Sequence, residues 1–260
     1  MSEQISPVDT TVSVSWGLGK SSAVSGTWAT IGDEIVRFDS SNDDGSVNFG
    51  RGCFDTVPTQ HPSNELVFVL GMCLGVTTKR FTNGTVVEGK VLPNTSKGTL
   101  ALEDAPEQSI TMASRKVRPY PPARLRIDGR SNPEDVWAGF DIGWRHRNRM
   151  EQTGDDIVGT EDNTSIGPES GTTYSLEIRR VDNNDLLYSD SGLSSESTSL
   201  VFSDLSFEGD VYLLLWSERD GYESWQKHNR DFLYTRTETR DIESNEYRLT
   251  EDGQYRIIEN

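Results

Sequence analysis

The stretch Arg118-Pro119-Tyr120-Pro121-Pro122 lies near the middle of the 260-residue chain and determines how its two halves are interpreted. Three prolines in five residues fix φ, remove three backbone N–H donors and disfavour the helical region for the residues that precede them. A helix and a central strand are therefore both excluded here. Because strand-like sequence lies on either side, we predict a stiff connector between two β domains.

Charge is distributed unevenly about this connector. Residues 1–118 contain 13 Asp and Glu against 10 Lys and Arg, and the following residues contain 29 against 15, within a formal net charge of −17. We therefore expect no binding to nucleic acid and no insertion into a membrane, since phosphate contacts need clustered Lys and Arg and the longest apolar run is too short to span a bilayer. Cys53 and Cys73 are too few for a disulfide framework, so we predict buried free thiols.

Residues 1–118 are predicted to form a β-rich anchoring domain. Residues 11–16 alternate with period two, and Gly32-Asp33 and Asn42-Asp43-Asp44-Gly45 are hairpin signals around a strand at 34–38. The continuous apolar character of residues 66–70 predicts a strand buried on both faces. Further candidate strands are 27–31, 75–81, 86–92 and 99–102.

Residues 119–236 are predicted to form a sandwich of seven strands, because alternating segments and turn signals recur at the spacing of such folds. The candidate strands are 123–127, 138–145, 172–181, 185–189, 198–202, 210–217 and 224–234. Residues 150–171 are polar and acidic, which predicts a long solvated loop. Residues 237–260 repeat a short strand around an Asp-Gly turn, which predicts a hairpin tail that packs on its own domain, pairs with a neighbouring chain or frays.

No motif indicates catalysis, so we expect neither enzymatic activity nor a cofactor. A Gly-x-Ser-x-Gly elbow is absent, and His61, His146 and His228 lie in unrelated contexts. The segment Gly17-Leu18-Gly19-Lys20-Ser21 ends like a phosphate-binding loop but lacks the first glycine of that motif.

The acidic loop offers a choice between two interpretations. Asp155 and Asp156, with Glu161 and Asp162, could hold Ca²⁺ through carboxylate oxygens, although their spacing is not that of an EF-hand. The alternative is an acidic segment in contact with water alone.

The basic cluster at residues 145–149 and the tryptophans are the other candidates for contacts with partners. On a strand, Arg145, Arg147 and Arg149 would share one face, where they could bind phosphate, bind a neighbour's carboxylates or form ion pairs across strands. Tryptophans in strands usually belong to the core, but some could form a sugar platform. The predicted interaction surface comprises Trp137, Arg147, Arg149, Asp155, Asp156, Trp225, Tyr247 and Tyr255.

Six segments share their order and spacing with one known family. They are Gly32-Asp33-Glu34-Ile35-Val36-Arg37-Phe38, Gly50-Arg51-Gly52 with Asp55-Thr56 and His61, Leu92-Pro93-Asn94-Thr95-Ser96-Lys97-Gly98-Thr99-Leu100, Val117-Arg118-Pro119-Tyr120-Pro121-Pro122, Trp144-Arg145-His146-Arg147-Asn148-Arg149-Met150-Glu151-Gln152-Thr153, and Gly167-Pro168-Glu169 with Thr173-Tyr174. As a set they resemble the C-terminal region of tail-tip or baseplate hub proteins of tailed bacteriophages and the similar host-specificity proteins of gene transfer agents.

This resemblance implies that the sandwich is fibronectin type III-like, with Trp144 and Tyr174 in its core, and that the protein is a structural, non-enzymatic virion component. The chain would dock on the hub beside other tail-tip proteins, as a homotrimer around the tail axis, and contact a host surface receptor. It would be located in the distal tail after assembly in the host cytoplasm. Hub proteins of the family are usually longer and carry ring-forming domains upstream. The alternative is a receptor- or carbohydrate-binding module, and a cell-wall hydrolase has only scattered carboxylates in its favour.

Overall fold

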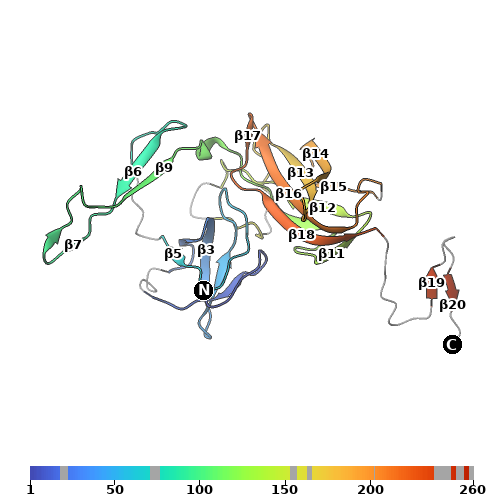
Figure 1. Ribbon diagram of the computed structural model, residues 1–260, viewed down its shortest axis with the longest axis horizontal. Helices are drawn as coiled ribbons and strands as arrows, with labels where there is room; N and C mark the ends of the chain where they lie inside the picture. The colour runs from blue at the N-terminus through green and yellow to red at the C-terminus, as the bar shows by residue number, and fades with distance from the viewer. Residues whose placement is uncertain are drawn as a thin grey trace.

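The computed structural model describes residues 1–17, 23–70, 77–152, 157–162, 166–201 and 203–236, and the backbone of two short strands at 247–249 and 255–257. These residues form an all-β fold, as predicted, with a single turn of 3-10 helix and no α-helix among them. Figure 1 shows two β units side by side and a thin arm that projects from the first unit. No helix in the described ranges is long and apolar enough to cross a membrane.

The first unit is an antiparallel sheet with the strand order β1-β4-β3-β2-β5. Its first four strands along the chain are β1 (Thr11–Ser13), β2 (Trp28–Ile31), β3 (Glu34–Ser41) and β4 (Ser46–Gly50). Gly32 and Gly45 have positive φ angles in the β2–β3 and β3–β4 turns, which confirms both hairpins that the sequence predicts. The alternate buried side chains of these strands, among them Val12, Ile31, Val36 and Phe38, form the first hydrophobic core.

The fifth strand, β5 (Val67–Val69), corrects one prediction. The apolar run at 66–70 predicts a strand buried on both faces, but among the described strands β5 lies at the edge of its sheet and pairs only with β2. Leu66 and Phe68 are 66% and 57% exposed. Successive side chains of a strand point to opposite faces of the sheet, and here only Val67 and Val69 pack against the first core. The continuous apolar character of this segment therefore does not mean burial on both faces.

An arm follows the first sheet. It consists of β6 (Val86–Lys90) paired with β9 (Glu107–Thr111), and of β7 (Asn94–Thr95) paired with β8 (Gly98–Thr99) nearer the tip (Figure 1). The predicted strand at 86–92 is present in shortened form, the one at 99–102 is replaced by the two-residue β8, and the described part of the one at 75–81 is not a strand. Neither hydrophobic core includes an arm residue.

The proline-rich stretch joins the two units without regular structure of its own. A 3-10 turn, η3 (Arg115–Val117), ends at Arg118, whose extended backbone (φ −69°, ψ 144°) leads into the prolines. Pro121 and Pro122 are buried, and β10 (Ala123–Ile127) begins directly after them. No α-helix passes through the connector, and the two hydrophobic cores lie on either side of it.

The second unit is a sandwich of two sheets. One has the strand order β10-β12-β15, with β12 (Asp141–Arg145) and β15 (Ser197–Ser199). The other has the order β11-β18-β16-β13-β14. Its strands are β11 (Asp135–Trp137), β13 (Thr173–Arg180), β14 (Leu186–Leu193), β16 (Gly209–Arg219) and β18 (His228–Thr235), with the short β17 (Tyr222–Glu223) beside β16.

The core of the sandwich lies between its two sheets. Trp144 on β12 and Tyr174 on β13 are each 1% exposed, and their ring centroids are 5.5 Å apart. This arrangement confirms the two core aromatic residues that the resemblance implies. The predicted strand at 138–145 is shortened to β12, because the chain turns at Gly139 (φ +80°). β11, a strand that the sequence did not predict, precedes this turn and joins the other sheet.

The chain ends in the predicted hairpin, in which β19 (Tyr247–Leu249) pairs with β20 (Tyr255–Ile257). Tyr247 is the register partner of Ile257, and Leu249 is the partner of Tyr255.

Candidate functional site

The first unit contains a fully buried carboxylate. The Oε1 atom of Glu34 accepts hydrogen bonds from Arg51 Nε (2.7 Å) and Gly52 N (2.8 Å). Its Oε2 atom accepts from Arg51 Nη2 (2.8 Å) and Thr59 N (3.1 Å) and lies 2.8 Å from His61 Nε2. Burial opposes ionisation of Glu34, but the hydrogen bonds from Arg51 and His61 outweigh it and lower its pKa below the ordinary value of 4.5.

This cluster does not have the geometry of a catalytic triad. In a triad, one imidazole nitrogen contacts the nucleophile and the other contacts the acid. Here the Oγ1 atom of Thr59 (3.3 Å) and the carboxylate of Glu34 both lie against Nε2 of His61, and Nδ1 lies 3.4 Å from Glu65. With Glu34 and Arg51 fully buried, the cluster holds the loop at 51–61 in place and presents no group to a substrate.

The loop held by Glu34 is also the surface on which the sandwich docks. Thr160 donates from its backbone N to Arg51 O (2.7 Å) and from Oγ1 to Gly52 O (2.8 Å), and Arg147 Nη1 donates to the same Gly52 oxygen (3.1 Å). Gly52 has φ +60°, and a Cβ atom there would lie 2.3 Å from Thr160 Oγ1. Only glycine allows this approach, so the two halves meet at a position that accepts no side chain.

These contacts correct the prediction of a solvated loop at 150–171. Ile157 and Thr160 are buried, and the backbone oxygen of Ile157 accepts a hydrogen bond from Arg37 of the first unit. Of the four carboxylates proposed for Ca²⁺, the two that the structure describes are engaged with arginines: Asp162 lies 2.8 Å from Arg37 and Glu161 lies 2.6 Å from Arg126. We refer to the described residues 157–162 of this loop as the clasp.

Contacts beyond the clasp extend this interface. Gln226 accepts from Val57 N (2.8 Å) and donates to Asp33 O (3.1 Å). Arg115 binds both carboxylate oxygens of Asp55. The two hydrophobic cores are therefore joined through buried polar contacts and not through a continuous apolar core.

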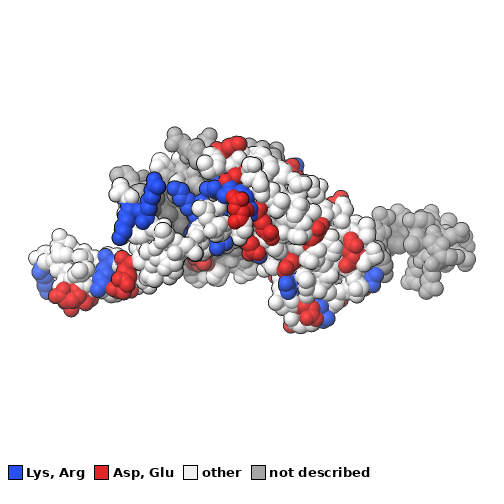
Figure 2. Space-filling model, turned by 90° about the horizontal axis from the view of Figure 1, so that it is seen from above, with Lys and Arg blue, Asp and Glu red and all other residues white. Residues whose placement is uncertain are grey.

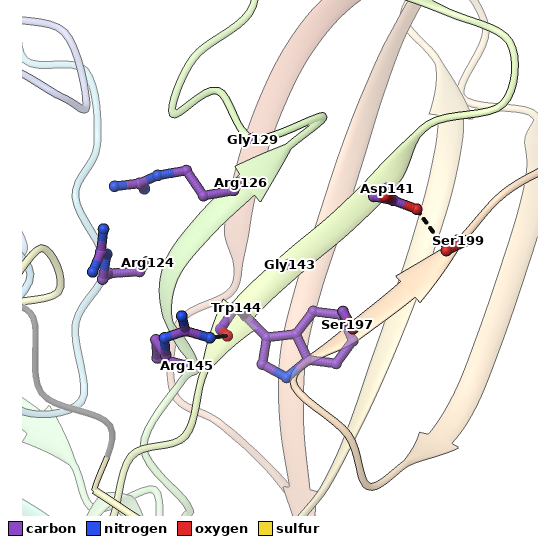
Figure 3. A pocket seen from close by; sticks show the side chains of 9 residues that line it. All are labelled: Arg124, Arg126, Gly129, Asp141, Gly143, Trp144, Arg145, Ser197 and Ser199. Carbon is purple, nitrogen blue, oxygen red and sulfur yellow. Dashed lines mark hydrogen bonds between the residues drawn. The ribbon is translucent and has the colours of Figure 1, made fainter.

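A hollow of about 310 Å³ opens on the outer face of the β10-β12-β15 sheet. In Figure 3 the guanidinium groups of Arg124, Arg126 and Arg145 lie on one side of it, and the hydrogen-bonded pair of Asp141 and Ser199 lies on the other. Gly143 is between them, in the middle of β12. Successive side chains of β10, β12 and β15 point alternately to solvent and to the core. This alternation places the residues that line the hollow on the solvent side of the sheet.

The basic cluster at 145–149 does not form one strand face, since β12 ends at Arg145. Arg145 pairs with Glu196 (3.1 Å), and Arg149 pairs with Glu169 (2.9 Å). Arg147 is 3% exposed and its guanidinium lies 5.2 Å from the ring of Tyr120 in the connector. The prediction that Arg147 belongs to an exposed interaction surface is therefore wrong; it joins the two units.

The two predicted tryptophans lie at opposite ends of β18 and form no common platform. Trp137 on β11 is the register partner of Thr235 at the end of β18, and the guanidinium of Arg130 lies 6.0 Å from its ring. Trp225 lies just before the start of β18. Trp225 is 41% exposed and lies beside Arg115 and Arg118, with guanidinium-to-ring distances of 5.3 and 5.7 Å. Figure 2 shows Lys and Arg side chains gathered between the arm and the sandwich on the visible face.

The remaining predicted surface residues are only partly placed. Asp155 and Asp156 lie outside the described residues, and Tyr247 and Tyr255 are known as backbone positions of β19 and β20. No group of three or more His, Cys, Asp or Glu in the described ranges is arranged to hold a metal ion. Cys53 is a buried free thiol, as predicted, and burial raises its pKa to about 12; Cys73 lies outside the described residues.

Sequence reasoning missed the buried Glu34 cluster, the clasp and the arginine-lined hollow. A partial signal existed for the hollow, since Arg124 and Arg126 alternate with apolar residues in a predicted strand and so share its outer face. No signal in the chain pairs Glu34 with Arg51 or Gly52 with Thr160, because these pairs are 17 and 108 residues apart.

Comparison with known proteins assigns no family. No family model and no curated protein matches the chain.

Proposed function

We propose that the protein is a structural component of a bacteriophage tail tip or baseplate, where it docks on the hub and displays the sandwich for assembly or contact with the host. The six segments that resemble tail-tip hub proteins support this proposal, and the all-β fold is compatible with it.

The observation that carries an assembly role is the arm. A two-stranded sheet alone is at best marginally stable in water, and the arm adds nothing to either core. Several of its apolar side chains are exposed, including Val86, Val91, Leu102 and Ile110. Both outer edges of the β6–β9 pair are also unpaired within the described residues, which leaves them available for strand addition by a neighbour.

The buried polar contacts at the clasp support the same role. Because the first unit and the sandwich are joined through Gly52, Thr160 and Arg147, a force or a docking event at one is transmitted to the other. The partners in this proposal are the hub, other tail-tip proteins and two further copies around the tail axis. A homotrimer is tested by the mass of the purified chain in solution and in complex with a hub protein.

Location in the virion is the direct test of the proposal. Antibodies against the chain, coupled to gold, should label the distal end of the tail in electron micrographs of virions from the phage that encodes it. Labelling restricted to the capsid, or absence of the chain from purified virions by mass spectrometry, would rule out a tail-tip role.

A matched pair of variants tests the arm. Ile110→Lys, at a 62% exposed arm position, is expected to abolish incorporation into tails, because a charge replaces an apolar contact with the neighbour. Val201→Lys, at a 58% exposed position of the sandwich, serves as the control and should be incorporated normally. Both changes should leave the melting temperature of the isolated chain almost unchanged. Normal incorporation of Ile110→Lys would contradict an assembly role for the arm.

A further inference from the structure

The hollow on the β10-β12-β15 sheet gathers three arginines on a domain that is otherwise acidic. Residues 119–236 contain 22 Asp and Glu against 12 Lys and Arg, yet Arg124, Arg126 and Arg145 lie together on this one face (Figure 3). Neighbouring carboxylates orient two of them: Glu161 binds both terminal nitrogens of Arg126, and Glu196 binds Nη1 of Arg145. The described side-chain bonds of Arg145 all use Nη1, which leaves its Nη2 and Nε for a ligand.

The space in the hollow exists because residue 143 is a glycine. Gly143 does not have a positive φ, so its backbone conformation is open to any residue. The nearest atom to a Cβ built there is Glu196 O at 3.9 Å, an ordinary contact. Neither backbone strain nor close packing therefore requires glycine in this central strand, where glycine weakens a sheet. Its effect is to leave the floor of the hollow open between the arginines and the serines.

The opposite wall of the hollow suits hydroxyl groups. Ser197 and Ser199 are exposed on β15, and Asp141 accepts a hydrogen bond from Ser199 Oγ (2.5 Å) with further lone pairs available. A guanidinium binds a carboxylate in a two-bond fork. Asp141 and the nearby Glu161 and Glu196 repel a phosphate dianion more strongly than a carboxylate, which carries a single charge. A single negative charge surrounded by hydroxyls fits this distribution of groups.

We propose that the hollow is a binding site for an acidic saccharide, with the sugar carboxylate on the arginine side and the sugar hydroxyls on Asp141, Ser197 and Ser199. A volume of about 310 Å³ is at the lower end of the range for small-molecule sites, which limits the ligand to one or two sugar units of a longer chain. This site is distinct from Trp137 and Trp225 and does not depend on the role of the arm.

The test is calorimetric titration of the full chain with trigalacturonate, with its methyl ester as the uncharged counterpart. Trigalacturonate should bind and the ester should not. Gly143→Val should reduce the affinity at least tenfold while the melting temperature stays equal or rises, because valine fills the hollow and favours a strand. Arg145→Gln should reduce the affinity by a similar factor. Arg179→Gln, which removes an arginine paired with Glu177 on the other sheet, is the matched control and should bind like the wild type.

Three results would overturn the proposal: no binding of trigalacturonate, equal binding of the ester, or wild-type affinity in Gly143→Val. Displacement of trigalacturonate by an equal concentration of inorganic phosphate would also overturn it, because it would indicate a site for anions in general. A melting temperature in Gly143→Val well below that of the wild type would show that glycine is needed for the fold, and would remove the argument for an open floor.

Discussion

His228 links the proline-rich stretch to the sandwich, and its protonation makes the stability of the fold depend on pH. Its Nε2 donates to Pro122 O (2.6 Å), the ring is fully buried, and burial together with Arg230 lowers its pKa to about 3. The unfolded chain therefore binds a proton below pH 6.5 that the folded chain does not bind, so stability is complete above pH 6.5 and falls as the pH drops towards 3. The slope is roughly 1.4 kcal/mol per pH unit.

We predict that His228→Gln, which can keep the donor to Pro122 but cannot titrate, loses less stability than the wild type between pH 7 and pH 5. The difference should be roughly 2 kcal/mol, measured by urea unfolding followed by tryptophan fluorescence. Carboxylates contribute equally to both proteins and cancel in the comparison. Parallel curves for the two proteins would show that His228 binds its proton equally well in the folded and unfolded states, which would contradict the lowered pKa.

At the scale of the element, the conformation of the loop at 51–61 depends on Glu34 of β3, whose carboxylate accepts hydrogen bonds from Arg51, Gly52 and Thr59. Glu34→Gln should cost about 3–5 kcal/mol, since Arg51 would remain buried without its counter-charge. Glu65→Gln is the matched control: it removes the more exposed carboxylate beside His61 and should cost less than about 1 kcal/mol. Thermal unfolding measures both. Equal and small losses would mean that backbone hydrogen bonds alone hold the loop.

At the scale of the whole molecule, the interface at Gly52 should make the two β units unfold together. Gly52→Ala is expected to be destabilised by the strain of a side chain at φ +60° and by a further 1–3 kcal/mol, roughly, from the collision with Thr160 and Pro58. Gly192→Ala imposes similar strain at φ +71° without a neighbour within 4 Å. Calorimetry should show one transition for the wild type and for Gly192→Ala, and two transitions for Gly52→Ala. A single transition in Gly52→Ala would mean that the interface contributes little to the coupling between the units.

Local patterns predicted much of the fold. The glycine turns at Gly32 and Gly45 and the core positions of Trp144 and Tyr174 depend on residues close in sequence or on strand alternation, and these were correct. Each of the seven predicted sandwich strands has a counterpart in the structure, but β11 and β17 were not predicted. The same patterns failed at β5, because an apolar run does not reveal that only one face of its sheet is covered by a core. They also failed at 150–171, because polar composition does not distinguish a segment in water from one that binds another domain.

The sequence by itself determined that this protein is all-β and that no helix passes through its proline-rich centre, because alternation and proline geometry act over a few residues. Only the tertiary structure decided that Arg147 is buried, that Gly52 packs against Thr160, and that three arginines lie on one side of a hollow whose floor is Gly143. These features depend on contacts between segments distant in the chain, which form only when both sheets and the interface between the units are in place.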